Sequence, residues 1–284
     1  MPPLQKAAFL MMISMVFFLL GNRVNFVAAP HPVAARHHPF LTTPSNIPLA
    51  DVQAWFAKVP IRLNPPIQDG WDLDAEFIQT WLSDRSPEIF LTFDDGPSPK
   101  ATGLILDILQ EHDIKATFFV LGRNVARFPE LAQRIVAEGH ELALHSQTHA
   151  DMLTLTREQK EAEIATSLSL LHWYFPEVRI RWFRPPYGHY DQEVVDIAHE
   201  YGLCLAMFNE ISADHRSSID DYAQVVLNGW GKIIVFHDGQ WPRQTPLTEA
   251  EARLIEGLKV SIGSVKTQGA QFMTLSSQFG EFCP

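Results

Sequence analysis

The chain has 284 residues, of which 46% are hydrophobic and 19% are charged, so it can bury a sizeable core. Its formal net charge of −11 argues against a nucleic-acid-binding protein, which needs a positive surface to displace counterions from phosphates. The 2 cysteines exclude a disulfide-dense scaffold and a four-thiolate zinc site, whereas the 12 histidines suffice for a metal site without thiolates.

The first 29 residues are typical of an export signal. Lys6 precedes an apolar run over 7–20, which is shorter than the ~20 residues that a membrane span usually needs. We predict that 1–29 is a signal peptide, or else an uncleaved N-terminal anchor, which would then be the chain's contact with a membrane. In both cases the remaining chain is expected to be exported, and then secreted or associated with the cell envelope.

Residues 30–86 are predicted to form an arm and a lead-in helix. The stretch 30–66 is rich in Pro, Ala and His and has weak periodicity, which favours a loosely ordered segment. A short helix is predicted over 72–81. Beyond them we expect one catalytic domain over 87–278 and a C-terminal tail over 279–284.

Strand-like and helix-like segments alternate from Ile89 onward. The predicted strands are 89–93, 116–121, 141–144, 181–183, 203–208, 233–236 and 271–275. The predicted helices are 100–111, 129–138, one opened by the capping box of Thr156 and Gln159, 191–201, 220–227 and a long one opened by Thr248 and Glu251. About seven such alternations predict an α/β fold with a parallel sheet or a (β/α) barrel. Catalytic side chains of such barrels lie at the carboxyl ends of the strands.

Polar, titratable residues follow strand after strand at that same end. They are Asp94 and Asp95, then His145 and His149, then Arg184, then Asp214, and finally His237. Scattered charges would be expected if these residues had only structural roles. Their registration therefore predicts a catalytic site.

Two histidines with three residues between them can present both imidazoles on one side of a helical turn or tight loop. A carboxylate from Asp94 or Asp95 would complete three ligands and leave open coordination positions, which is typical of catalytic metal sites. The other aspartate is then free to act as a general base on a water molecule. His237 would protonate the leaving group. The sequence thus predicts metal-assisted hydrolysis of an acyl group.

Two further residues are expected to support this chemistry. Asp214 would accept a proton from His237 and fix its orientation. Arg184 would pair with Asp94 and hold it ionised. Two alternatives stay open for the cysteines: Cys204 and Cys283 pair in an oxidising compartment, or Cys204 is a buried thiol.

These motifs resemble, in order, those of the NodB-type polysaccharide deacetylases, which form carbohydrate esterase family four. The matching segments are Thr92–Pro97 (Thr-Phe-Asp-Asp-Gly-Pro), His145–His149 (His-Ser-x-x-His), Arg184–Gly188 (Arg-x-Pro-Tyr-Gly) and Ile234–His237, an apolar stretch ending in His. The resemblance covers roughly 89–275. It implies a distorted (β/α) barrel that removes N-acetyl or O-acetyl groups from a sugar.

The resemblance also implies a role for each site residue. Asp94 is similar to the family's catalytic base and His237 to its acid, with Arg184 orienting Asp94. The metal ligands would be Asp95, His145 and His149. Tyr187 would supply a backbone N–H to the oxyanion.

Two imidazoles and one carboxylate suit a divalent ion, for which we predict Zn²⁺, with Co²⁺, Ni²⁺ and Fe²⁺ as alternatives.

The family's fourth motif, Asp-x-x-Asp-Trp, departs here: Ile211 replaces its first Asp and His215 its Trp, while Asp214 is kept. This affects substrate choice more than chemistry. The leading prediction is N-deacetylation of N-acetylglucosamine units in chitin-like or peptidoglycan chains. The alternatives are an O-acetyl esterase acting on xylan or another wall glycan, and a catalytically silent glycan-binding domain.

Overall fold

The computed structural model describes residues 72–73, 82, 86–212, 218–239 and 249–283. All of them belong to a compact unit that spans Pro44–Pro284. The predicted export signal and most of the predicted arm lie outside the described residues. Within the described part of the chain, no helix is both long enough and apolar enough to cross a bilayer.

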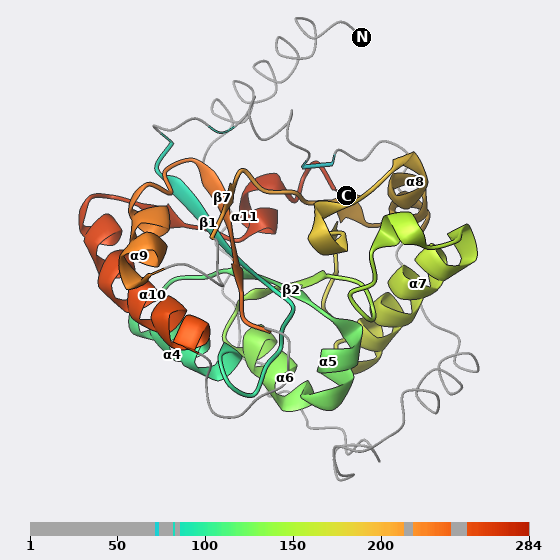
Figure 1. Ribbon diagram of the computed structural model, residues 1–284, viewed down its shortest axis with the longest axis horizontal. Helices are drawn as coiled ribbons and strands as arrows, with labels where there is room; N and C mark the ends of the chain where they lie inside the picture. Colours follow the sequence, from blue (N-terminus) through green and yellow to red (C-terminus); the bar gives the residue numbers. More distant parts are fainter. Residues whose placement is uncertain (1–71, 74–81, 83–85, 213–217, 240–248, 284) are drawn as a thin grey trace, which may run out of the picture. The chain divides into compact units, whose positions relative to one another are not determined.

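A curled sheet of parallel strands forms the centre of this unit (Figure 1). The strand order is β5-β4-β3-β2-β1-β7-β6, and β8 pairs with β1 beside this path. The strands are β1 (Glu88–Asp94), β2 (Thr117–Val120), β3 (Glu141–Leu144), β4 (Trp182–Phe183), β5 (Cys204–Leu205), β6 (Glu210–Ile211), β7 (Lys232–His237) and β8 (Gln271–Phe272). The predicted architecture, an α/β barrel-like fold with about seven parallel strands, is confirmed.

Helices surround the strands (Figure 1). They are α4 (Thr102–Glu111), α5 (Gly122–Arg127), α6 (Pro129–Ala137), α7 (Arg157–Tyr174), α8 (Gln192–Glu200), α9 (Ile219–Leu227), α10 (Glu249–Thr267) and α11 (Leu275–Phe279). The short 3-10 helices η1 (Met152–Thr154) and η2 (Pro186–Gly188) follow β3 and β4. The capping box predicted for Thr156 and Gln159 is present at the start of α7.

Alternation along the central strand β1 decides which side chains reach the interior of the curled sheet. Ile89, Leu91 and Phe93 pack in the core cluster between the strands and the helices. Phe90 belongs to a second cluster on the inner face of the sheet. Because successive side chains of a strand point to opposite faces, Thr92 and Asp94 share the inner face with Phe90. The Asp94 side chain therefore points into the interior of the curled sheet.

The short helix α11 and the segment after it pack against the inner cluster. Phe279 and Cys283 are buried, and the rings of Phe90 and Phe279 lie 5.3 Å apart. Glu141 on β3 accepts a hydrogen bond from the backbone N–H of Ser276 at 3.1 Å, in the first turn of α11. The segment predicted as a C-terminal tail therefore contributes Phe279 and Cys283 to the core.

A disulfide joins Cys204 at the start of β5 to Cys283, with 79 residues of sequence separation. Of the two alternatives for Cys204, the structure thus has the paired one, and the cysteine is also fully buried. A crosslink that closes so long a loop restricts the unfolded chain strongly.

Reduction of this disulfide should lower the free energy of unfolding by about 2–4 kcal/mol. Thermal melts with and without a phosphine reductant would measure the effect. A Cys204→Ala, Cys283→Ala double variant is the control, and its melting temperature should not respond to the reductant. Equal melting temperatures of the oxidised and reduced wild type would contradict the prediction.

Some short elements were not predicted. They are α5, β6 and α11, none of which carries a run of apolar residues long enough to show periodicity. Of the predicted helix 72–81 the structure describes Asp72 and Leu73, and Leu73 forms a parallel bridge with Ala206.

The predicted strand 271–275 is wrong beyond Phe272. The side chain of Thr274 caps the next helix by accepting a hydrogen bond from the N–H of Ser277, so the chain turns into α11 at Leu275.

Candidate active site

The carboxyl end of β1 carries two adjacent aspartates in different settings. Asp94 is the last residue of the strand and is 3% exposed on its inner face. Asp95 follows with a φ of 74°, a left-handed conformation that redirects its side chain away from the strand alternation. The side-chain amide of Asn124 donates to the backbone carbonyl of Asp95 at 2.7 Å and fixes this turn.

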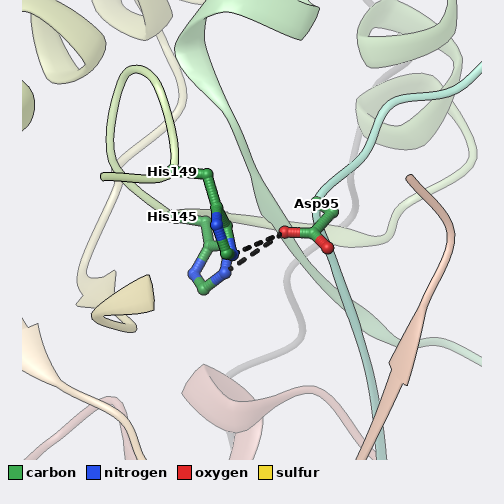
Figure 2. A group of neighbouring side chains, drawn as sticks. All are labelled: Asp95, His145 and His149. Atoms are coloured by element: carbon green, nitrogen blue, oxygen red, sulfur yellow. Dashed lines mark ion pairs between the residues drawn. The ribbon is translucent and has the colours of Figure 1, made fainter. Parts of the chain in front are cut away.

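The loop after β3 carries both candidate histidine ligands. It is a tight loop and not a helical turn, since Ser146 and His149 have φ values of 72° and 65°. Figure 2 shows both imidazoles facing the Asp95 carboxylate, and the two rings meet edge-on at an interplanar angle of 63°. The rings of His145 and His149 lie 5.2 Å apart.

Three side chains thus converge from two strand ends. The Asp95 Oδ1 atom lies 3.5 Å from His145 Nε2 and 3.2 Å from His149 Nε2, and all three donor atoms are within 4.8 Å of one another. Donor atoms about 2.0–2.2 Å from one tetrahedral ion are separated by roughly 3.3–3.6 Å. Among the described residues, none donates a hydrogen bond to the buried Asp95 Oδ1. The donor set and its spacing therefore fit a divalent cation.

The protonation of the donors also suits a cation. The Nδ1 atom of His145 lies 2.7 Å from the carbonyl oxygen of Arg184, which can only accept, so Nδ1–H is the donor in this contact and Nε2 is the nitrogen directed at the ligand set. Burial lowers the pKa of His149 more than the Asp95 carboxylate raises it. Burial raises the pKa of Asp95, but contact with His145 and the charges of the neighbouring histidines outweigh burial and hold it below its ordinary value.

Arg184, immediately after β4, holds the second aspartate. It is 1% exposed, and its Nη1 donates to Asp94 Oδ1 at 2.8 Å and to Thr92 Oγ1 at 2.8 Å. Its Nε donates to the carbonyl of Ala206 at 2.9 Å, and its guanidinium lies 3.9 Å from the ring centre of Phe119. Asp94 therefore has one oxygen fixed by Arg184. The other, Oδ2, lies 3.9 Å from His145 Nε2 and faces the candidate ligands.

The remaining predicted residues lie around this centre. His237 is the last residue of β7 and is paired in register with Asp94 on β1, so it reaches the same edge of the sheet. Tyr187 packs its ring edge-on against His149 at 4.6 Å and is 62% exposed. Asp214 lies outside the described residues, so its predicted partnership with His237 stays a prediction.

Backbone strain is concentrated here. In the part of the chain that the structure describes, five residues other than glycine have positive φ, and four of them are Asp95, Ser146, His149 and Tyr187. Such conformations persist only where the surrounding structure enforces them, and they cluster at functional sites. The site is thus held in shape by its surroundings before any ligand arrives.

Asp238 is a buried carboxyl behind the Asp94–Gly96 turn, and the motifs did not indicate a role for it. Its Oδ2 accepts a hydrogen bond from the hydroxyl of Thr102, and its backbone N–H donates to the carbonyl of Asp94 at 3.1 Å. A side chain at Gly96 would collide with this carboxyl, so glycine is required there. Burial, together with the charges of Asp95 and Asp94, raises the pKa of Asp238 to about 7.

This raised pKa predicts a pH-dependent stability of the metal-free protein. The unfolded carboxyl loses its proton near pH ~4 and the folded one near 7, so the free energy of unfolding falls as pH rises between these values. Between pH 5 and pH 8 the wild type should lose roughly 3 kcal/mol of its free energy of unfolding through this carboxyl. The side chain of Asp238→Asn stays neutral at every pH, so the variant should not show this loss. The melting temperature of the variant relative to wild type should therefore rise from pH 5 to pH 8.

The matched control is Asp107→Asn, which alters an exposed carboxylate on α4. Its melting temperature relative to wild type should change little over the same pH range. A difference between Asp238→Asn and wild type that is equal at both pH values would show that Asp238 does not titrate as stated.

The fold and the site together define a class: a parallel β/α enzyme whose titratable side chains meet at the carboxyl ends of its strands. Similarity to known proteins identifies the family within this class. The sequence profile described as polysaccharide deacetylase matches residues 83–206. A chitooligosaccharide deacetylase of Sinorhizobium fredii is 36% identical over 171 residues, which are 59% of this chain and 80% of that protein.

A peptidoglycan-N-acetylglucosamine deacetylase of Bacillus cereus is 32% identical over 198 residues, or 68% of each chain. The solved Bc1960 peptidoglycan N-acetylglucosamine deacetylase superposes with a TM-score of 0.63 at 29% identity, covering 70% of this chain and 91% of that one. This chain therefore belongs to the polysaccharide deacetylase family, and the resemblance seen in the motifs is confirmed. It is a hydrolase of carbon–nitrogen bonds other than peptide bonds.

Proposed function

We propose that this chain is a metal-dependent deacetylase that removes the N-acetyl group from N-acetylglucosamine units of chitin-like or peptidoglycan chains. The observation that carries the proposal is the Asp95–His145–His149 donor set beside Asp94, whose orientation Arg184 fixes. The relatives named above, which act on chitooligosaccharide and peptidoglycan according to their names, support the choice of substrate.

Asp95, His145 and His149 would hold the ion, for which Zn²⁺ is the proposed identity and Co²⁺, Ni²⁺ or Fe²⁺ the alternatives. When bound, such an ion polarises the acetyl carbonyl and makes a water molecule more acidic. Three protein ligands leave coordination positions for water and substrate.

Asp94 is the proposed general base. Its Oδ2 faces the ligand set while Oδ1 is held by Arg184, so the free oxygen can take the proton of the attacking water. The water oxygen forms a bond to the acetyl carbon, and the carbon–nitrogen bond then breaks. His237, next to Asp94 in the sheet, gives a proton to the leaving nitrogen. The products are acetate and a free amine on the sugar.

Two further assignments complete the proposal. The backbone N–H of Tyr187 is placed by the left-handed turn of η2 and would donate to the developing oxyanion. Asp214 would orient His237. We also propose that the chain acts outside the cytoplasm, as its predicted export signal suggests, and the disulfide between Cys204 and Cys283 is consistent with an oxidising compartment.

The test is acetate release from chitooligosaccharides, peptidoglycan and acetylxylan, each measured with and without a chelator. Release from the first two substrates, lost on chelation and restored by Zn²⁺, is the expected result. Release from acetylxylan alone would favour the O-acetyl esterase alternative. Binding of a glycan without any acetate release would favour the silent glycan-binding alternative and overturn the proposal.

A further inference from the structure

The loop between the two candidate histidine ligands is hydrogen-bonded to a carboxylate that takes no part in the proposed reaction. Glu163, in the second turn of α7, accepts hydrogen bonds from the backbone N–H groups of Gln147 at 3.0 Å and Thr148 at 2.7 Å. It also accepts from the hydroxyl of Thr148 at 2.6 Å. These three donors lie between His145 and His149 in the sequence.

Two backbone carbonyls of the same loop also accept hydrogen bonds from its neighbours, on α5 and on α7. The N–H of Gly122 donates to the carbonyl of Ser146 at 3.0 Å, and the N–H of Arg123 donates to the carbonyl of Gln147 at 3.1 Å. The hydroxyl of Ser167, one turn after Glu163 on α7, donates to the carbonyl of Ser146 at 3.1 Å. The loop is therefore clamped between α5 and α7.

This clamp decides where the His149 imidazole points. His145 is anchored independently, since its Nδ1 donates to the carbonyl of Arg184. No comparable anchor from the described residues holds the His149 ring. Its position depends on the path of the loop, in which Ser146 and His149 both have positive φ. The backbone N–H of His149 donates to Ser146 Oγ at 3.0 Å. A shift of this loop would therefore move His149 relative to Asp95 and leave His145 in place.

We propose that Glu163 is a positioning residue for the metal site, which sets the distance between His149 and the other two donors by holding Gln147 and Thr148. The inference rests on the proposed function, in which Asp95, His145 and His149 bind a cation. Its mechanism is geometric: the carboxylate is an acceptor for three donors on the loop. Substitutions that keep the acceptor geometry should keep cation affinity, and those that remove it should not.

Two variants separate geometry from charge. Glu163→Ala removes every acceptor and leaves two backbone N–H groups without their partner. Glu163→Gln loses the charge, but its amide oxygen can still accept from both N–H groups while its NH₂ donates to the Thr148 hydroxyl. The matched control is Glu161→Ala, which removes a carboxylate on the same helix that accepts from the Tyr201 hydroxyl at 2.6 Å.

The measurement is the Kd of Zn²⁺ for the metal-free full-length chain, determined by competition with a chromophoric chelator well below the melting temperature. We expect Glu163→Ala to raise this Kd by about 10–100-fold, as outer residues around metal sites typically do. Glu163→Gln should stay within a few-fold of wild type, and so should Glu161→Ala. Activity of Glu163→Ala at saturating Zn²⁺ should largely recover.

Each contrary outcome has a distinct meaning. Unchanged Zn²⁺ affinity in Glu163→Ala, with tight binding by wild type, overturns the inference alone. Equal weakening in the Ala and Gln variants overturns it in favour of a charge effect. Absence of Zn²⁺ binding in wild type overturns the proposed metal site and the inference with it. Should Glu163→Ala fail to fold, Thr148→Val decides, because it removes one of the three contacts: a raised Kd supports the inference and an unchanged Kd overturns it.

Discussion

Asp94→Asn should lower the rate of acetate release by about 10²–10⁴-fold, which is the contribution of a well-placed general base. The variant keeps the size of the side chain and removes its negative charge, and with the charge its ability to take a proton. Metal content should stay at the wild-type level, because the Asp95, His145 and His149 donors are unaltered. Steady-state assays with Zn²⁺-loaded protein, together with elemental analysis, would measure both quantities.

The same substitution has a second consequence for stability. The Arg184 guanidinium is 1% exposed and donates to Asp94 Oδ1, so the variant leaves a buried positive charge without its carboxylate. Breaking a buried pair in this way typically destabilises a protein by about 3–5 kcal/mol. Assays therefore belong well below the melting temperature of the variant. Asp196→Asn, at an exposed carboxylate on α8, is the control, and wild-type rates in Asp94→Asn would refute the assignment of the base.

His149→Ala should abolish stoichiometric metal binding and, with it, turnover. The substitution removes one of three donors, a larger change than the outer-residue changes that weaken metal sites by about 10–100-fold. The side chain of His149 is 21% exposed, so the protein should remain folded without it. Elemental analysis of the purified variant would report the loss, and a Zn²⁺ titration would show whether excess ion restores any acetate release.

His189→Ala is the matched control for that experiment. His189 lies near the site, with its ring centre 5.8 Å from that of Tyr187; its side chain is 51% exposed and 3.1 Å from a carboxylate oxygen of Asp151, and it is not part of the donor set. Its removal should leave metal content at the wild-type level. Full metal occupancy and full activity in His149→Ala would show that the cation binds elsewhere.

The long elements of this fold were predictable from periodicity, and the short ones were not. Strand β1 has a continuous apolar pattern and agrees with its predicted position to within a residue at each end, and helix α7 begins where its capping box predicted. By contrast β4 and β5 are two-residue strands, shorter than the segments predicted for them. Strands of that length are defined by pairing with their neighbours, which a single sequence does not record.

The candidate site shows the same division. His145 and His149 were predicted because ligand chemistry imposes side-chain types at recognisable spacings, whereas the choice of Asp95 over Asp94 came from the family resemblance; the structure brings the three together. Glu163 was missed because it acts on backbone N–H groups, for which any suitably placed acceptor would serve. A faint signal existed: Glu163 lies on α7 one residue before the buried Ile164, beside the face that packs inward.

The four residues with left-handed backbone conformations around the site lower the stability of the fold, and three of them carry side chains that the site needs. Each of these conformations costs about 1–3 kcal/mol, and glycine would relieve it. At Asp95 and His149, however, glycine would delete a ligand, and at Tyr187 it would delete the ring that packs on His149. Efforts to make this scaffold more heat-resistant should therefore leave these loops alone and target outer helices such as α9 and α10, where gains need not be traded against turnover.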